Sequence, residues 1–226
     1  MTTSAPEPAS FAPTAATTVR YAQRASYDRA EAYRILDDAF VAHVGFATGD
    51  QPFVIPMVYG RDGDHLLLHG SVATRLMRAL DKGAKVCVTV THVDGLVLAR
   101  SHFHHSINYR SVVVLGTATR LRDADAERAF QIIVDHVAPG RAAETRPTSD
   151  VERRQTMVLA VPIEEASLKV RTGPPIDDEA DLSAEPWSSA WAGVLPMSVV
   201  AGEPQADDHT GDGVAEPASI RPWGRP

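Results

Sequence analysis

The feature that most constrains the fold of this chain is a series of short apolar stretches, each ended by a tight-turn signal. Residues 41–48 are followed by Gly49-Asp50, and residues 53–59 are followed by the turn 60–63. Short runs rich in β-branched and aromatic residues, separated by Gly and Asp, are typical of strands joined by hairpins. Further strands are predicted at residues 65–69, 84–91, 96–100, 112–121, 157–161 and 167–171, with a turn at Asp94-Gly95 between two of them. Many short strands with few helices favour an antiparallel barrel over a fold of βαβ units.

Helical periodicity interrupts this series in three places. Ser26 can cap a helix that runs to about Phe40, and a short helix is predicted over residues 74–80. A longer helix is predicted over residues 123–137, where acidic residues in the first turn favour a helix N-terminus. No Gly-x-Gly-x-x-Gly or Walker sequence is present, so a Rossmann or P-loop nucleotide site has no support. The predicted class is mainly β with flanking α-helices.

The two ends of the chain differ in composition from the middle. Residues 1–19 are rich in Ala, Thr, Pro and Ser, and residues 201–226 are rich in Pro, Gly and Asp, so both are predicted to be disordered tails. One domain is expected between them, over residues 20–200. Of the formal net charge of −7, residues 172–226 carry ten acids and two bases, which leaves the body nearly neutral. Because nucleic-acid binding needs a broad basic surface, no nucleic-acid partner is expected.

No feature of the sequence indicates export or membrane insertion. The chain has no apolar run near the roughly 20 residues that span a bilayer. The N-terminus lacks the basic and apolar regions of a signal peptide, and Cys87 is the single cysteine. We expect a cytoplasmic protein with no membrane partner.

The most informative motif is a Gly-Ser turn that leads directly from a strand into a helix. The predicted strand ends at His69-Gly70-Ser71, and the helix begins near Thr74. The first N–H groups of a helix have no intrahelical partner and attract an anion. The hydroxyls of Ser71 and Thr74 and the guanidinium of Arg75 suit a phosphate group. Taken alone, the same residues also fit an ordinary capped helix with a surface arginine.

Four segments, in this order along the chain, resemble a known family. They are residues 53–59, residues 69–75, residues 105–118 with the sequence HSINYRSVVVLGTA, and residues 169–197 with KVRTGPP and WAGVLP. Together they resemble the FMN-binding split barrels of the pyridoxamine 5′-phosphate oxidase-like superfamily, in its Nim-type (nitroimidazole-resistance-like) branch. The resemblance implies a six-stranded antiparallel Greek-key split β-barrel that forms a two-fold homodimer with flavins at the interface.

The resemblance also implies a cofactor site. Ser71, Thr74 and Arg75 would hold the FMN phosphate, although the classical oxidases carry a basic pair where this chain has Arg75 alone. His69 is the one candidate catalytic residue. The remaining candidate FMN contacts are Pro56, Met57, Val58 and Tyr59 along the ring, mainly through their backbone, Gly70 in the turn, Asn108, Arg110 and Ser111 from the same or the partner subunit, and Trp191 as a cover for the ring.

The implied function is that of an FMN-dependent oxidoreductase. FMN would supply the redox chemistry, NAD(P)H is the candidate reductant, and the acceptor would be a small nitro compound or quinone. Two alternatives stay open: a non-catalytic flavin-nucleotide-binding or storage protein, and a barrel that binds haem or a deazaflavin. Haem would draw attention to His102, His104 and His105, of which the first and second would share one face of a strand. No metal site is expected, because no acidic or cysteine partner completes a recognisable spacing.

Overall fold

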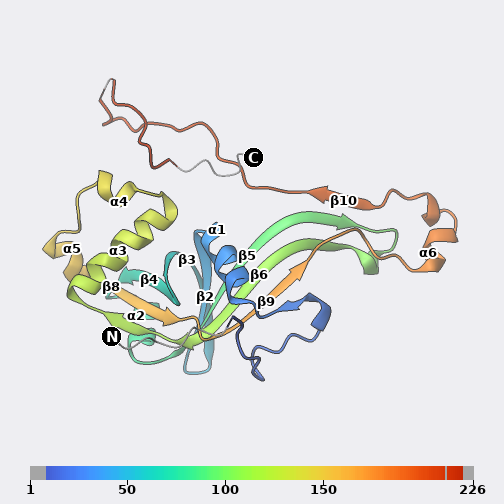
Figure 1. The fold of residues 1–226 in the computed structure, drawn as a ribbon, viewed down its shortest axis with the longest axis horizontal. Helices are drawn as coiled ribbons and strands as arrows, with labels where there is room; N and C mark the ends of the chain where they lie inside the picture. Colours follow the sequence, from blue (N-terminus) through green and yellow to red (C-terminus); the bar gives the residue numbers. More distant parts are fainter. Residues whose placement is uncertain (1–8, 212, 221–226) are drawn as a thin grey trace.

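The computed structural model describes residues 9–211 and 213–220, which form an antiparallel sheet wrapped into a barrel, with helices around it (Figure 1). The strands are β1 (Ala25–Ser26), β2 (Val41–Thr48), β3 (Gln51–Asp62), β4 (His65–Ser71), β5 (Lys85–Leu98), β6 (Ser106–Thr117), β7 (Thr119–Leu121), β8 (Thr156–Pro162), β9 (Glu165–Arg171) and β10 (Gly193–Pro196). The helices are α1 (Arg29–Asp38), α2 (Arg75–Asp81), α3 (Asp123–Val137), α4 (Arg141–Glu144), α5 (Asp150–Gln155) and α6 (Glu179–Ser183), with 3-10 turns η1 (Ala22–Arg24), η2 (His102–His104) and η3 (Trp187–Ser189).

The predicted class, mainly β with flanking helices, is confirmed, but the strand count of six is wrong. The described residues contain ten strands, in the order β1-β9-β6-β5-β2-β3-β4-β8-β7, with β10 paired to β5. Three of the additional strands are short edge pieces, β1, β7 and β10, with two, three and four residues. Segments this short carry no readable alternation of apolar and polar residues, so the sequence pattern does not reveal them.

A corner at Ala118 closes the barrel. Residues 112–121 were expected as one strand, but the chain bends between β6 and β7. Before the corner β6 pairs with β5 and β9, and after it β7 pairs with β8. One continuous run of chain therefore belongs to both halves of the sheet.

The predicted turn at Asp94-Gly95 is wrong, because β5 continues through it. The register between β5 and β6 shifts between Val93 and Gly95, which marks a β-bulge. Gly95 is needed there since a Cβ would lie 3.0 Å from the carbonyl oxygen of Leu195 in β10. The side chain of Arg110 holds the Asp94 carboxylate at 3.0 Å. The outer parts of β5 and β6 thus extend beyond the barrel.

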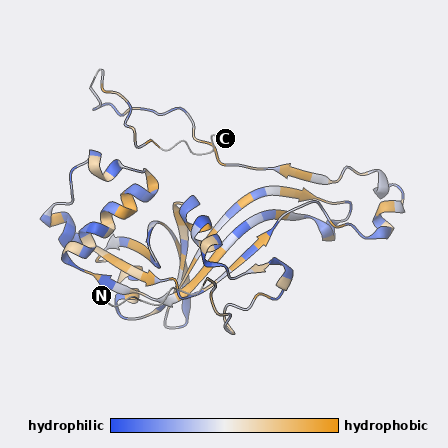
Figure 2. Cartoon of the chain, viewed as in Figure 1, coloured by the Kyte–Doolittle hydropathy of each residue, from blue (hydrophilic) through white to orange (hydrophobic). Residues whose placement is uncertain are grey.

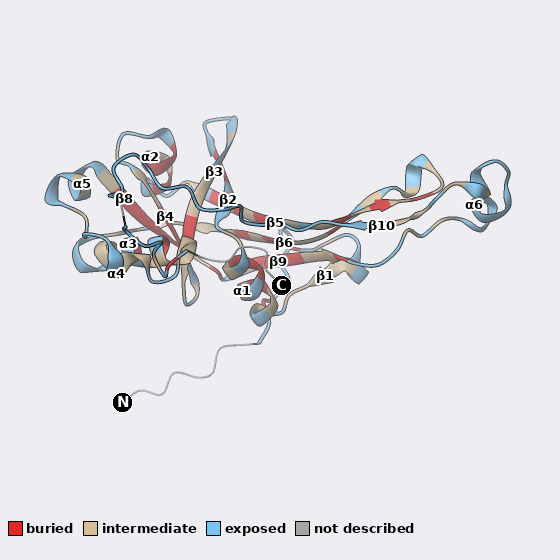
Figure 3. Ribbon diagram, turned by 90° about the horizontal axis from the view of Figure 1, so that it is seen from above, coloured by how far each residue is buried: buried red, intermediate tan, exposed pale blue. Residues whose placement is uncertain are grey.

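We refer to residues 93–108 and 172–196 together as the arm. Figure 1 shows it projecting from the barrel, with α6 at its far end and β10 returning along β5. Figure 3 shows buried residues along the barrel strands and mainly exposed residues around α6. The arm therefore contributes little to the hydrophobic core.

The core has an inner and an outer part. Inside the barrel, alternate residues of the strands pack together, among them Val44, Val88 and Leu159. On the outer face of β4 and β8, helix α3 buries Ala129 and Ile133 against the sheet. Apolar residues follow the strands and the inner side of α3, whereas hydrophilic residues dominate around α5 (Figure 2). The position of α3 matters below because it covers the outer side of His69.

The helix predictions hold, with one correction at a cap. Helix α3 spans the predicted residues, and Thr74 caps α2 as its position in the motif suggests. Helix α1 begins three residues later than the proposed cap Ser26, because the side chain of Asp28 accepts the hydrogen bond from the backbone N–H of Glu31 at 2.7 Å. The hydroxyl of Ser26 instead donates to the carboxylate of Glu31.

Parts of both predicted tails are described. Phe11 is 3% exposed, its N–H donates to the carbonyl of Tyr27, and the guanidinium of Arg29 lies over its ring. Near the other end, the hydroxyl of Ser219 donates to the carboxylate of Glu144. Residues 1–8, 212 and 221–226 of the predicted tails lie outside the described residues. Among the described helices, none is long and apolar enough to cross a membrane.

Candidate functional site

The turn between β4 and α2 brings Ser71, Thr74 and Arg75 together. The Thr74 hydroxyl donates to the carbonyl of Ser71 at 3.0 Å and accepts from the N–H of Met77 at 3.4 Å. The Ser71 hydroxyl accepts from the N–H of Ala73 at 3.3 Å. Both hydroxyls therefore shape the start of the helix, as Ser and Thr caps do.

A basic depression of about 330 Å³ lies beside this turn, lined in part by Arg75, Arg78 and Lys82. The guanidinium of Arg75 lies over the ring of Phe53, 4.5 Å from its centre, and has no carboxylate partner among the described residues. No acidic residue lines the depression. The sequence motif pointed to Arg75 alone, although a spacing of three and then four residues already places all three bases on one helix face. Three unneutralised cations suit a phosphate group.

Strand β3 presents an exposed apolar edge close to this depression. Val54 is 66% exposed and Pro56 is exposed, whereas Met57 and Val58 are half-buried on opposite faces of the strand. Tyr59 is completely buried, and its hydroxyl donates to the carbonyl of Leu36. Burial raises the pKa of Tyr59. A ligand lying along β3 would reach only the backbone of Tyr59.

His69, on the outer face of β4, has a nitrogen with nothing bound to it. The residue is half-buried, and its Nδ1 atom is buried without a hydrogen-bond partner among the described residues. Its ring meets the ring of Phe130 edge to face, with 5.8 Å between the ring centres. Burial lowers the pKa of His69, so the imidazole is neutral at pH 7. A buried polar atom without a partner is unusual in a folded protein, and it leaves this nitrogen available to a ligand.

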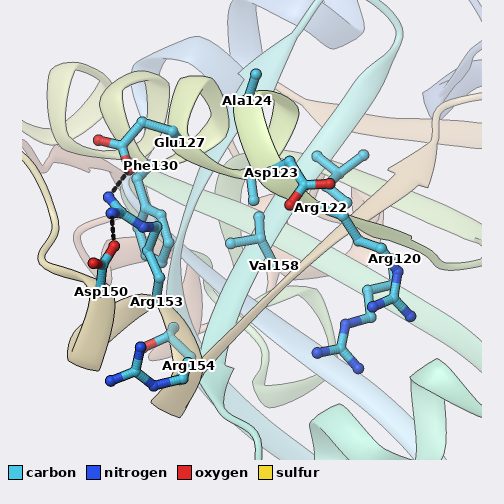
Figure 4. A pocket seen from close by; sticks show the side chains of 13 residues that line it. Arg120, Arg122, Asp123, Ala124, Glu127, Phe130, Asp150, Arg153, Arg154 and Val158 are labelled. Carbon is cyan, nitrogen blue, oxygen red and sulfur yellow. Dashed lines mark hydrogen bonds and ion pairs between the residues drawn. The ribbon is translucent and has the colours of Figure 1, made fainter.

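A cavity of about 550 Å³ lies between β7, β8, α3 and α5 (Figure 4), and His69 is not among the residues that line it. Phe130 and Val158 line it, and both contact or pair with His69. Four arginines surround it: Arg120, Arg122, Arg153 and Arg154.

The arginines of this cavity differ in their partners. Arg153 bonds to Glu127 and Asp150, as Figure 4 shows, and Arg120 reaches Asp81 at 3.3 Å. Arg122 and Arg154 have no carboxylate partner in the described part of the chain. The cavity was not anticipated, because its walls come from separate segments and no single motif contains it.

Asn108, Arg110 and Ser111 form a separate group on β6. Arg110 bonds to Asp94 and Asp38, and these carboxylates raise its pKa. The Ser111 hydroxyl donates to the carbonyl of Lys169 at 3.2 Å. Asn108 donates to the carbonyl of Gly173 and accepts from Arg171. Within one chain α2 packs on β2, β4, β7 and β8, so the two predicted groups are not brought together.

Trp191 and the histidine cluster lie on the arm. Trp191 is 68% exposed, and its ring packs over Gly193, the first residue of β10. The expectation that His102 and His104 share a strand face is wrong, since both belong to the 3-10 turn η2. The Phe103 and His104 rings pack edge to face there. Neither feature touches His69 or α2.

The comparisons with known proteins agree with this architecture. Flavocytochrome Anf3 from Azotobacter vinelandii is 40% identical over 93% of this chain and 97% of its own, with a TM-score of 0.84. The FAD and heme binding protein from Mycobacterium smegmatis is 34% identical over 87% of this chain and 95% of its own, with a TM-score of 0.82. A putative 5-nitroimidazole antibiotic resistance protein from Bacteroides thetaiotaomicron is 26% identical over 65% and 86%, with a TM-score of 0.54. Among curated proteins no sequence matches.

The family model described as pyridoxamine 5′-phosphate oxidase matches residues 28–170, which run from the cap of α1 to the end of the barrel in β9. This range contains the candidate phosphate-binding turn at Ser71–Arg75, the exposed edge of β3 and His69. The resemblance seen in the sequence is therefore confirmed: the chain belongs to the pyridoxamine 5′-phosphate oxidase family of split β-barrels.

Proposed function

We propose that this protein is a redox protein that binds a flavin and a haem. The flavin part rests on the turn at α2, where Ser71, Thr74 and Arg75 lie together beside an acid-free depression with two more bases. This set would hold the phosphate of FMN, the cofactor expected from the sequence, or the corresponding phosphate of FAD, which the mycobacterial relative binds. The exposed apolar edge of β3 would take the ring, with Pro56 at its centre.

The haem part rests on a different observation, the buried Nδ1 atom of His69 that has no partner. A neutral imidazole is a common ligand of haem iron. The cavity lined by Phe130 and Val158, the two neighbours of His69, is within the usual size range of small-molecule sites, about 300–1,000 Å³. The unpaired Arg122 and Arg154 would bind the propionates. The Azotobacter and mycobacterial relatives, at 40% and 34% identity, are named as a flavocytochrome and as an FAD and heme binding protein.

The two cofactors would together supply electron transfer, since a flavin exchanges electrons singly or in pairs and a haem iron exchanges one at a time. The chain's own residues would hold and orient them. Phe130 would fix the ring of His69 by edge-to-face packing on its outer side. NAD(P)H as reductant and a nitro compound or quinone as acceptor remain our proposals for the partners. A specific acceptor should reoxidise the reduced protein faster than oxygen alone does.

We also propose a two-fold homodimer. Large apolar residues stay exposed on the barrel strands and at the start of the arm: Val41, Val54, Ile55 and Val93. Exposed apolar residues in such numbers around one sheet often mark a protein interface. Val54→Glu should convert the dimer to a monomer in light scattering, and an unchanged mass would count against an interface through Val54.

The first test is the absorption spectrum of the purified protein, with the released cofactors identified by mass spectrometry. We expect a flavin band and a Soret band, each near one cofactor per chain. The double variant S71A/R75A should lose the flavin and keep the haem. The exposed Arg20 serves as control, and Arg20→Ala should lose neither.

His69→Ala should lose the Soret band, whereas His65→Ala, at an exposed position on the same strand, should keep it. If His104→Ala removes the Soret band and His69→Ala does not, the haem lies on the arm and our placement is wrong. A protein that binds neither added flavin nor added haemin would overturn the proposed function as a whole.

A further inference from the structure

A second cluster of ligand-type side chains lies at the far end of the arm, away from both proposed cofactor sites. It consists of His104 in η2, Asp178 at the N-cap of α6 and Asp181 within α6. One ligand atom from each of these residues lies within 4.8 Å of the others. Figure 1 shows that α6 belongs to the outermost part of the arm, so neither the barrel nor α3 takes part.

The imidazole of His104 is unsatisfied in spite of a close neighbour. Its Nε2 atom is buried and has no hydrogen-bond partner in the described part of the chain, although the Oδ2 atom of Asp178 is only 3.3 Å away. The two atoms approach each other without hydrogen-bond geometry. Such a pair fits two ligand atoms that face a common third position.

Asp178 is unusual for the N-cap residue of a helix. An Asp at this position normally accepts a hydrogen bond from the N–H groups of the first turn. The side chain of Asp178 makes no such bond, and its carboxylate turns toward His104 instead. The missing cap bond is a separate observation from the unpartnered Nε2 atom of His104.

The described residues offer no basic side chain that compensates the charge of the cluster. In the described ranges, neither Asp178 nor Asp181 forms an ion pair with a lysine or arginine. The neighbouring Asp177 is different, because the backbone N–H and guanidinium of Arg100 bind it at 2.9 and 2.8 Å and lower its pKa. Asp177 thus anchors the segment. The carboxylates of Asp178 and Asp181 lie close to His104 and have no lysine or arginine partner among the described residues.

We propose that His104, Asp178 and Asp181 bind a divalent transition metal ion, with zinc as the best fit. Zinc bonds of about 2.0–2.2 Å to nitrogen and oxygen in a tetrahedron put neighbouring ligand atoms about 3.3–3.5 Å apart. The distance between Nε2 and Oδ2 agrees with this separation. An imidazole ligand favours zinc over magnesium or calcium, which prefer oxygen alone. Water completes the fourth position.

The role of the ion is to join α6 to η2. Helix α6 has five residues and buries none of them, so packing holds it weakly. A metal that bridges the two segments closes the end of the arm and fixes the start of the chain that leads to Trp191 and β10. The proposal does not depend on the flavin or the haem.

The test is a zinc titration of the untagged, cofactor-loaded protein by calorimetry, together with hydrogen exchange of the arm. We expect one zinc ion per chain, and slower amide exchange in residues 176–190 when zinc is bound. His104→Ala and the shape-conserving Asp181→Asn should each weaken zinc binding at least tenfold. The neighbouring exposed His102 is the matched control, and His102→Ala should leave the affinity unchanged.

Three outcomes would overturn the proposal. Zinc that binds equally well to the His104→Ala variant is held elsewhere on the surface. Magnesium that binds as tightly as zinc excludes an imidazole ligand. Failure to bind zinc at 100 μM in wild-type protein that has its normal spectrum refutes the site directly.

Discussion

Gly60 controls how closely α3 lies on the sheet, and Gly60→Ala tests this contact. A Cβ at residue 60 would lie 3.0 Å from Ile133 Cα, 3.1 Å from its Cγ1 and 3.2 Å from its backbone nitrogen. Ordinary contacts of this kind are 3.4–4 Å, and two of the three atoms belong to the helix backbone, which no rotamer change can move. The whole helix therefore has to shift.

The expected cost follows from two opposing terms. Overpacking of a core costs about 1–3 kcal/mol. Replacing a strand glycine by alanine by itself returns about 0.5–1 kcal/mol of unfolded-state entropy. We expect Gly60→Ala to lower the free energy of unfolding by about 0.5–2 kcal/mol. Gly45→Ala is the matched control, because its Cβ would meet its nearest neighbour, the Cys87 carbonyl, at an ordinary 3.5 Å.

The assay is urea unfolding followed by far-UV circular dichroism, with equal cofactor content in both variants. The two alanine variants should differ in stability by about 1–3 kcal/mol, with Gly60→Ala the weaker. Because α3 also carries Phe130, which packs on His69, Gly60→Ala should weaken haem binding as well, whereas Gly45→Ala should not. Equal stability of the two variants would refute the steric reasoning, and reduced stability with unchanged haem affinity would separate α3 from the proposed haem site.

Three further predictions concern buried polar atoms and the arm. Tyr59→Phe removes the hydroxyl that donates to the Leu36 carbonyl and should cost about 1–2 kcal/mol in urea unfolding with no loss of flavin; an unchanged midpoint would mean that water replaces the hydroxyl. In cofactor-free protein, burial holds the pKa of His69 below its ordinary value of 6.5, so the unfolded chain binds more protons as the pH falls below 6.5. Stability should therefore decline with falling pH below that value, and His69→Gln should reduce the slope; an identical pH profile would argue against a buried neutral imidazole. Gly95→Ala should push the Leu195 carbonyl away and speed amide exchange in β10 while the barrel stays protected; unchanged exchange would show that the bulge adapts.

Much of the barrel could be predicted from the sequence because its signals are local. Residues 41–48 form the expected strand, and α3 spans the expected residues, since alternation and helical periodicity report which face of a segment is buried. The turn at Ser71 and Thr74 was also found in this way, because a cap and the turn before it lie within a few residues of each other.

Other features depended on segments far apart in the sequence. The dipeptide Asp94-Gly95 is typical of a turn. In the structure, however, β10, about a hundred residues later in the chain, pairs with β5 here, and Gly95 lies at a bulge in a continuous strand. β10 itself has four residues and exists only because β5 offers an open edge. Local propensity could not distinguish these outcomes, because the hydrogen-bond partner decides them.

The candidate sites divide in the same way. The sequence by itself determined the barrel class, because each strand and turn has a local pattern. It also determined the candidate phosphate-binding turn with Arg75, because this turn lies between one strand and one helix that follow each other in the chain. Only the tertiary structure decided that His69 faces Phe130 beside a cavity with unpaired arginines, and that His104 meets two aspartates. The physical reason is that sheet register and helix packing bring those side chains together, and neither leaves a local pattern in the chain.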